Sequence, residues 1–167
     1  ENTLMSALAR VNYNYKSRYM FTASFRADGS SKFMDGHRWG YFPSGAFAWR
    51  MGEEPWPRMA GWINEAKLRV SVGMTGNNRV GDFSAEAYIP NNLGNRDLTW
   101  ETTTQYNIGY DLSLFRSRLN FTVDLYLKNT TDLLLNANMP YSSGYTKVFK
   151  NVGAVRNQSI ELSLSTV

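Results

Sequence analysis

The 167-residue sequence contains no cysteine, which excludes a disulfide framework and a thiolate metal site. It has no stretch near the ~20 consecutive apolar residues that a membrane-spanning helix requires. It has one histidine, His37, and none of the Gly-x-Ser-x-Gly, His-Glu-x-x-His or Walker-type glycine motifs of common enzymes. These absences argue against a helical membrane protein and against an enzyme, and they give no reason to expect a cofactor or a metal.

Long runs of one charge are also missing. The 18 Lys and Arg residues are scattered among 14 Asp and Glu residues, for a formal charge of +4. Nucleic-acid-binding proteins gather basic residues on one surface or in one run. We therefore expect no nucleic-acid partner.

The sequence is rich in residues that favour strands. Aromatic residues make up 14 % of the chain, and they suit a pleated, half-buried surface. Apolar and polar residues alternate with a period of two in most segments, which is typical of strands with one face buried. The alternation predicts seven strands and no helix, at residues 5–15, 19–27, 42–51, 67–75, 100–114, 119–128 and 159–165.

The connections between these strands differ in length. Lys16-Ser17 and residues 115–118 are short breaks, whereas residues 28–40, 76–99 and 129–151 are long and polar. Outer-membrane barrels alternate short periplasmic turns with long external loops in this way. Residues 52–66 form a connector, because Pro55 and Pro57 exclude a central strand and permit at most a short helical turn after them.

Strand length separates two architectures. Most of the predicted strands keep their alternation for nine or more residues, which suits the ~9–11 tilted residues that cross a bilayer. The fold class predicted is therefore all-β, a segment of an antiparallel transmembrane β-barrel, with the polar faces toward a wet lumen. The alternative is a soluble β-sandwich that binds carbohydrate or protein, in which the same apolar faces pack together.

Several aromatic residues fall near the predicted strand ends. Barrels carry girdles of aromatic side chains at the two membrane interfaces. This placement favours girdle positions over sugar stacking for Trp39, Tyr41, Trp49, Trp100, Tyr106 and Tyr110.

A series of short motifs resembles the SusC/RagA-like family of TonB-dependent outer-membrane receptors. The motifs follow the order of the family and cover effectively the whole chain, although Gln158-Ser159 replaces the glycine-containing run that the family usually has there. They include Arg26-Ala27-Asp28-Gly29-Ser30, Arg38-Trp39-Gly40-Tyr41-Phe42, Gly73-Met74-Thr75-Gly76-Asn77, Leu98-Thr99-Trp100-Glu101 and Asn151-Val152-Gly153.

The resemblance implies more than the residue pattern does. It implies that residues 1–167 are about seven strands of a 22-stranded barrel in the bacterial outer membrane of Bacteroidetes, without the family's plug domain and TonB-contact segment. It also implies import of oligosaccharides or peptides, with outer-membrane lipid, TonB and a SusD-like surface lipoprotein as partners.

Contacts with a ligand or a lid protein are expected in the long loops, because binding residues gather on loops held by a rigid scaffold. The aromatic and amide side chains of two loops are the candidates: Tyr88, Asn91, Asn92, Tyr141 and Tyr145.

Overall fold

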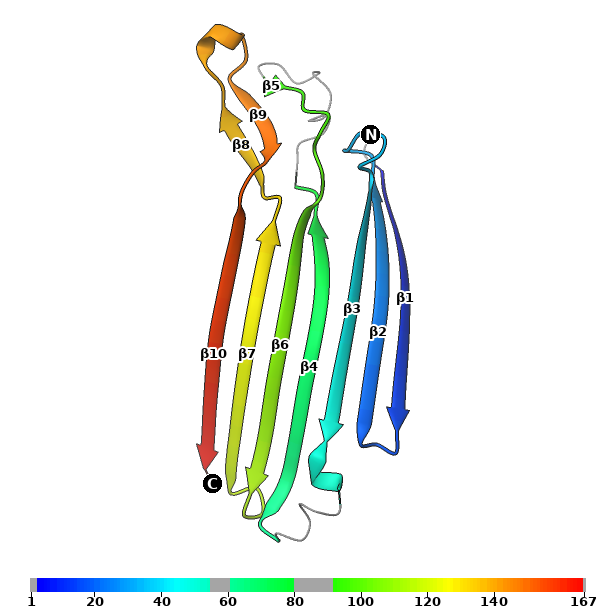
Figure 1. Cartoon of the computed structure of the whole chain (residues 1–167), viewed down its shortest axis with the longest axis vertical. Coiled ribbons are helices and arrows are strands. Elements are labelled where there is room, and N and C mark those ends of the chain that lie inside the picture. Colours follow the sequence, from blue (N-terminus) through cyan, green and yellow to red (C-terminus); the bar gives the residue numbers. More distant parts are fainter. Residues whose placement is uncertain (1–2, 55–60, 80–91, 167) are drawn as a thin grey trace.

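The computed structural model describes residues 3–54, 61–79 and 92–166, which form one long antiparallel sheet with a small sheet at one end (Figure 1). The large sheet has seven strands in the order β1-β2-β3-β4-β6-β7-β10. No helix in the described ranges has the length and hydropathy to cross a membrane. The seven strands have 12 to 15 residues each: β1 Leu4–Tyr15, β2 Tyr19–Ser30, β3 Trp39–Arg50, β4 Ile63–Asn77, β6 Glu101–Leu114, β7 Leu119–Thr131 and β10 Ala154–Thr166.

The register sorts the side chains into two faces, because residues directly opposite in a ladder point to the same side. One continuous row across five strands joins Phe47, Val70, Ile108, Leu125 and Ile160. All five side chains are exposed. This row belongs to the apolar face of the sheet.

The next row along the strands lies on the opposite, polar face and contains Ala48, Arg69, Gly109, Asp124 and Glu161. No second sheet covers the apolar face within the described residues, because the small sheet lies beyond the strand ends (Figure 1). The described residues therefore do not form a β-sandwich, and the prediction of an alternating, two-faced sheet is confirmed.

Both predicted short breaks are tight turns without glycine. In the β1–β2 turn Lys16 and Ser17 have positive φ angles of 51° and 54°, and the β6–β7 turn has three such residues, Phe115, Arg116 and Ser117, with 53°, 58° and 63°. Such turns match the right-handed twist of the strands that they join. Each left-handed non-glycine residue costs roughly 1 kcal/mol or more, so the surrounding contacts must hold it.

The connector before β4 differs in detail from its prediction. A 3-10 turn at Met51–Glu53 lies before the prolines, and β4 already begins at Ile63. Pro55 and Pro57 lie outside the described residues. Glu54 ties this segment to the β1–β2 turn, since its carboxylate accepts hydrogen bonds from Tyr19 (2.8 Å) and Arg18 (3.4 Å).

The long loops contain more structure than predicted. A three-stranded sheet in the order β5-β9-β8 joins β5 Asn92–Leu93, β9 Lys147–Asn151 and β8 Leu134–Asn138, with a 3-10 turn at Tyr141–Ser143 at the tip. In addition β2 extends to Ser30 and β3 begins at Trp39, so the first loop is only residues 31–38. The predicted loops 28–40, 76–99 and 129–151 were too long because strand pairing continues into them.

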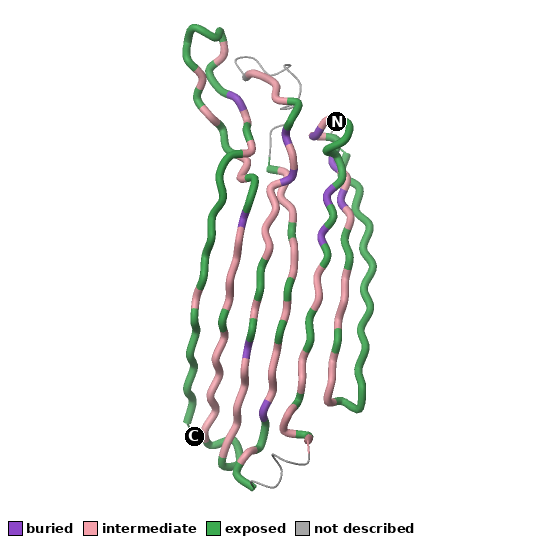
Figure 2. Tube along the Cα trace, viewed as in Figure 1, coloured by how far each residue is buried: buried purple, intermediate pink, exposed green. Residues whose placement is uncertain are grey.

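Most of the buried residues lie at this long-loop end (Figure 2). Phe33, Phe42, Leu98 and Trp100 form a cluster, with ring centroids 5.4 and 5.6 Å from Trp100 to Phe33 and Phe42. The indole Nε1 of Trp100 donates to the Arg38 carbonyl at 3.2 Å. This cluster holds in place the segments that lead from the large sheet into the loops.

Candidate functional site

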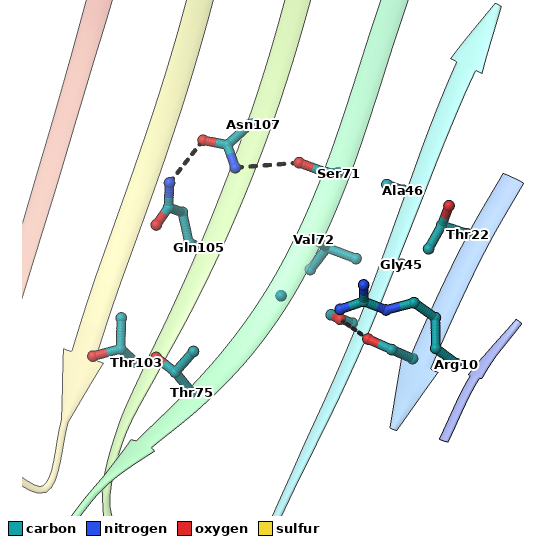
Figure 3. Close-up of a pocket in the computed structure, with 13 residues that line it drawn as sticks. Arg10, Thr22, Gly45, Ala46, Ser71, Val72, Thr75, Thr103, Gln105 and Asn107 are labelled. Carbon is teal, nitrogen blue, oxygen red and sulfur yellow. Dashed lines mark hydrogen bonds between the residues drawn. The ribbon is translucent and has the colours of Figure 1, made fainter. Parts of the chain in front are cut away.

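A shallow hollow of about 320 Å³ lies on the polar face, across β1 to β6 (Figure 3). Its wall carries the cation Arg10 and otherwise neutral groups. The hydroxyl and amide side chains are Thr22, Ser24, Ser44, Ser71, Thr75, Thr103, Gln105 and Asn107, and the other lining residues are Gly45, Ala46, Val72 and Gly73.

These polar side chains are bonded to one another across the strands. The hydroxyls of Ser24 and Ser44 are 2.6 Å apart, and Asn107 donates to Ser71 at 3.2 Å. Gln105 donates to the Asn107 side-chain oxygen at 2.9 Å (Figure 3). Such a wall keeps spare acceptors and donors for water or a polar ligand, but it carries little charge.

An ion cluster lies further along the same face. Arg69 on β4 bonds both oxygens of Asp111 on β6, at 2.9 and 3.1 Å, and reaches Asp124 on β7 at 3.0 Å. Gly109 lies between them, and an added Cβ there would collide with Asp124 Oδ1 and lie 2.8 Å from Arg69 Nη2. The missing side chain of Gly109 therefore lets one guanidinium join three strands.

Two side chains fasten the loops to the sheet. Asn151 donates to the carbonyls of Thr99 and Asp132 and accepts from the Thr99 amide, each at 2.9 Å. Glu101 accepts from Asn77 at 3.0 Å and from the Leu134 amide at 3.1 Å. The loop strands are thus held in a defined position beyond the ends of the large sheet.

The structure places three of the five predicted contact residues. Tyr141, 94 % exposed, lies at the tip of the β8–β9 hairpin, and Tyr145 is half-buried on the return segment. Asn92 pairs in parallel with Lys147, so the two predicted loops meet. Tyr88 and Asn91 lie outside the described residues. Their role in binding stays a prediction.

The predicted girdle is corrected at two positions. Trp100 is only 8 % exposed and packs in the loop-end cluster, so it cannot lie at a lipid interface. Tyr106 is on the apolar face in mid-sheet, opposite Val72 and Leu127. Trp39 and Tyr41 are exposed at the long-loop end of that face, and Trp49 and Tyr110 share one row near the short turns through Leu68.

The sequence interpretation missed the packing partners of Trp100. Phe33 and Leu98 stand in segments interpreted as polar loop, although both are apolar residues among turn formers. An isolated large apolar residue in a polar loop is the signal that could have identified them.

A family model described as "TonB dependent receptor-like, beta-barrel" matches residues 3–166. TonB-dependent receptor P39 of Formosa agariphila is 44 % identical over 98 % of this chain. TonB-dependent receptor SusC of Bacteroides thetaiotaomicron is 33 % identical, also over 98 %. The chain spans only 17 % and 18 % of the lengths of these two relatives.

Solved structures agree with these relationships. The chain superposes on a structure of the RagAB peptide transporter with a TM-score of 0.85 and 30 % identity, covering 98 % of this chain and 19 % of that chain. The siderophore receptor PirA from Pseudomonas aeruginosa shares the fold, with a TM-score of 0.70 at 12 % identity over 98 % of this chain and 31 % of that chain. This chain belongs to the TonB-dependent receptor family and is a β-barrel segment whose homologues include SusC and the RagAB receptor.

Proposed function

We propose that these strands are part of the barrel wall of an outer-membrane importer that takes up oligosaccharides or peptides by a TonB-dependent route. The observation that carries the proposal is the two-faced, single-layer sheet with strands of 12 to 15 residues. Its exposed apolar face suits lipid, and its polar face suits a water-filled lumen. The open edges of β1 and β10 would pair with further strands of the barrel wall.

The wall chemistry and one relative support the proposed class of nutrient. The hollow on the polar face offers hydroxyls and amides with a single cation, which suits neutral, hydrogen-bonding molecules such as sugars and peptide backbones. A related solved structure is a peptide transporter. This supports uptake of a polar oligomer over uptake of a small ion.

A surface lipoprotein of the SusD type is proposed as the partner at the long-loop end. The β8–β9 hairpin projects beyond the large sheet (Figure 1), and residues 133–146 carry no charged side chain. Exposed tyrosines give much contact area at a low cost in side-chain entropy. Tyr141 is therefore the first contact that we assign to this partner or to its ligand.

Two measurements on the full-length receptor test the proposal. The band of the outer-membrane fraction should shift on a detergent gel when the sample is boiled, because closed barrels resist detergent until heated. Uptake of labelled oligosaccharides or peptides should require the receptor and TonB. A protein that stays in the soluble fraction, or uptake that is unchanged without TonB, would contradict it.

A further inference from the structure

The two short turns of the sheet share a four-residue pattern. The β1–β2 turn reads Tyr15-Lys16-Ser17-Arg18, and the β6–β7 turn reads Phe115-Arg116-Ser117-Arg118. In both, an aromatic residue is followed by a cation, a serine and an arginine. The two turns lie a hundred residues apart in the sequence and at the same end of the sheet (Figure 1).

The backbone conformation is shared at the two central residues, although Phe115 also has a positive φ of 53° and Tyr15 does not. The cation and the serine have positive φ in both turns, and the arginine amide donates to the aromatic carbonyl at 3.0 Å in one turn and 3.3 Å in the other. Asn-Gly or Asp-Gly is the usual sequence for such a turn, since these residues enter the left-handed region easily. Lys-Ser and Arg-Ser are poor choices for the backbone, which points to a use for their side chains.

Neighbouring groups hold the second turn in this conformation. The Phe115 amide donates to the Trp62 carbonyl at 2.9 Å, and the Arg116 amide donates to the Asn64 side chain at 2.6 Å. The rings of Phe115 and Trp62 stack with centroids 6.2 Å apart. These contacts therefore hold the β6–β7 turn in one conformation.

Three of the four cations of these turns are exposed, and Arg18 is half-buried beside its acidic partner. The Lys16 ammonium lies 5.2 Å from the centre of the Tyr15 ring, a side chain of the apolar face. Arg18 pairs with Glu54. Arg116 and Arg118 are exposed, and neither forms an ion pair with any residue in the described ranges.

Aromatic side chains lie close to these cations, at the short-turn end of the sheet. Tyr15, Tyr19 and Trp49 form a run of ring contacts, with centroids 6.4 and 6.0 Å apart. Trp62 and Phe115 are 48 % and 55 % exposed. Aromatic side chains of barrels mark the boundary between hydrocarbon and headgroups. The cations that follow in the chain then fall in the layer of lipid phosphates.

We propose that the two turns bind the phosphate groups of anionic phospholipids, with Lys16, Arg116 and Arg118 as the ligands. The inference rests on the proposed function, which puts the apolar face in a bilayer and the short turns at its inner surface. Lysine and arginine near an anionic membrane surface gain affinity of about fivefold per cation. The paired aromatic rings hold each turn at the height where this contact is possible.

The test measures which lipid surrounds one turn of the full-length receptor. A fluorophore is attached to a Ser117→Cys variant, on a background free of other cysteines, in nanodiscs of equal parts phosphatidylglycerol and phosphatidylcholine. Either lipid carries bromine on its acyl chains and quenches the fluorophore on contact. We expect phosphatidylglycerol to be favoured at the probe about fivefold or more.

Matched variants identify the cause. Arg116→Gln with Arg118→Gln should bring the ratio of quenching by the two lipids to one, whereas Arg116→Lys with Arg118→Lys should keep the preference. The control, Lys147→Gln with Lys150→Gln, removes the same charge from the long-loop end and should leave the preference unchanged.

Three other results would count against the proposal, and they differ in meaning. Equal quenching by both lipids in the parent protein refutes headgroup binding while leaving the importer intact. A preference that survives Arg116→Gln with Arg118→Gln assigns it to other residues. No quenching by either lipid, with no shift on boiling, refutes the membrane barrel itself.

Discussion

Gly109 leaves the space in which the Arg69 guanidinium reaches Asp111 and Asp124. Substitution of this glycine is the sharpest test of the ion cluster. In Gly109→Ala the new methyl group would meet Asp124 Oδ1 and would lie 2.8 and 2.9 Å from Nη2 and Cζ of Arg69. The guanidinium must move away, so that its bonds to Asp124 are lost and those to Asp111 are bent. We expect the barrel to be less stable.

The magnitude follows from how exposed the cluster is. The side chains of Arg69, Asp111 and Asp124 are 41 %, 32 % and 40 % exposed, so solvent screens them and each ion pair contributes about 1 kcal/mol or less. Loss of one pair and distortion of the other gives about 1–2 kcal/mol. The matched control is Gly45→Ala, whose added Cβ meets only the Thr22 carbonyl at 3.9 Å. It should be neutral or stabilising by about 0.4–1 kcal/mol.

The assay is equilibrium unfolding of the full-length receptor in detergent micelles. Gly109→Ala should fall below Gly45→Ala by about 1–2 kcal/mol, because the gain from a less flexible unfolded chain is common to both variants and cancels. The same substitution in an Arg69→Ala background should cost less, because Asp124 is then free to turn aside. An equal cost with and without Arg69, or no difference between the two glycine variants, would refute the reasoning.

Three further predictions concern the two faces of the sheet, the loops and the hydrophobic cluster of Phe33, Phe42, Leu98 and Trp100. Ile108→Lys should lower barrel stability by about 2–4 kcal/mol in lipid, whereas Asn107→Lys on the opposite face should cost under about 1 kcal/mol; equal effects would contradict the assignment of the faces. Asn151→Ala removes three hydrogen bonds of 2.9 Å and should speed protease cleavage in the loops while the temperature of the gel shift stays unchanged. Phe42→Ala empties the space beside Gly40 and Gly76 and should cost about 3–5 kcal/mol in unfolding free energy, well above Phe47→Ala on the exposed face.

Much of the sheet could be predicted from the sequence, because a strand with one apolar face alternates apolar and polar residues, and this alternation shows which side chains share a face. Lys67 to Thr75 alternates without a break, and it lies wholly inside β4. The first residues of β10 were missed because they do not alternate. Arg156, Asn157 and Gln158 are polar in succession, yet they pair with β7 because backbone hydrogen bonds do not depend on side-chain pattern.

Tertiary contacts account for the other errors. Trp100 begins an alternating segment, and nothing in its neighbours shows that Phe33 and Leu98 will cover it. The strands of the small sheet have two to five residues, too few for a period of two to be visible. The prediction that Tyr141 is a contact residue came from residue type and loop position, and the exposure of Tyr141 depends on the turn that holds it.

The pairing of β3 with β4 covers only Ser44 to Arg50 on β3, whereas β6 pairs with β7 from Thr102 to Leu114. From Pro43 back to Trp39, β3 is no longer paired with β4, and the ring of Phe42 packs against Gly76. Amide protons in a region with few inter-strand hydrogen bonds exchange through local opening. Cooperative unfolding units are separated at such regions. The sheet would then open as two blocks, β1–β3 and β4–β10, so a mechanical or thermal load on the barrel would be released first along this seam.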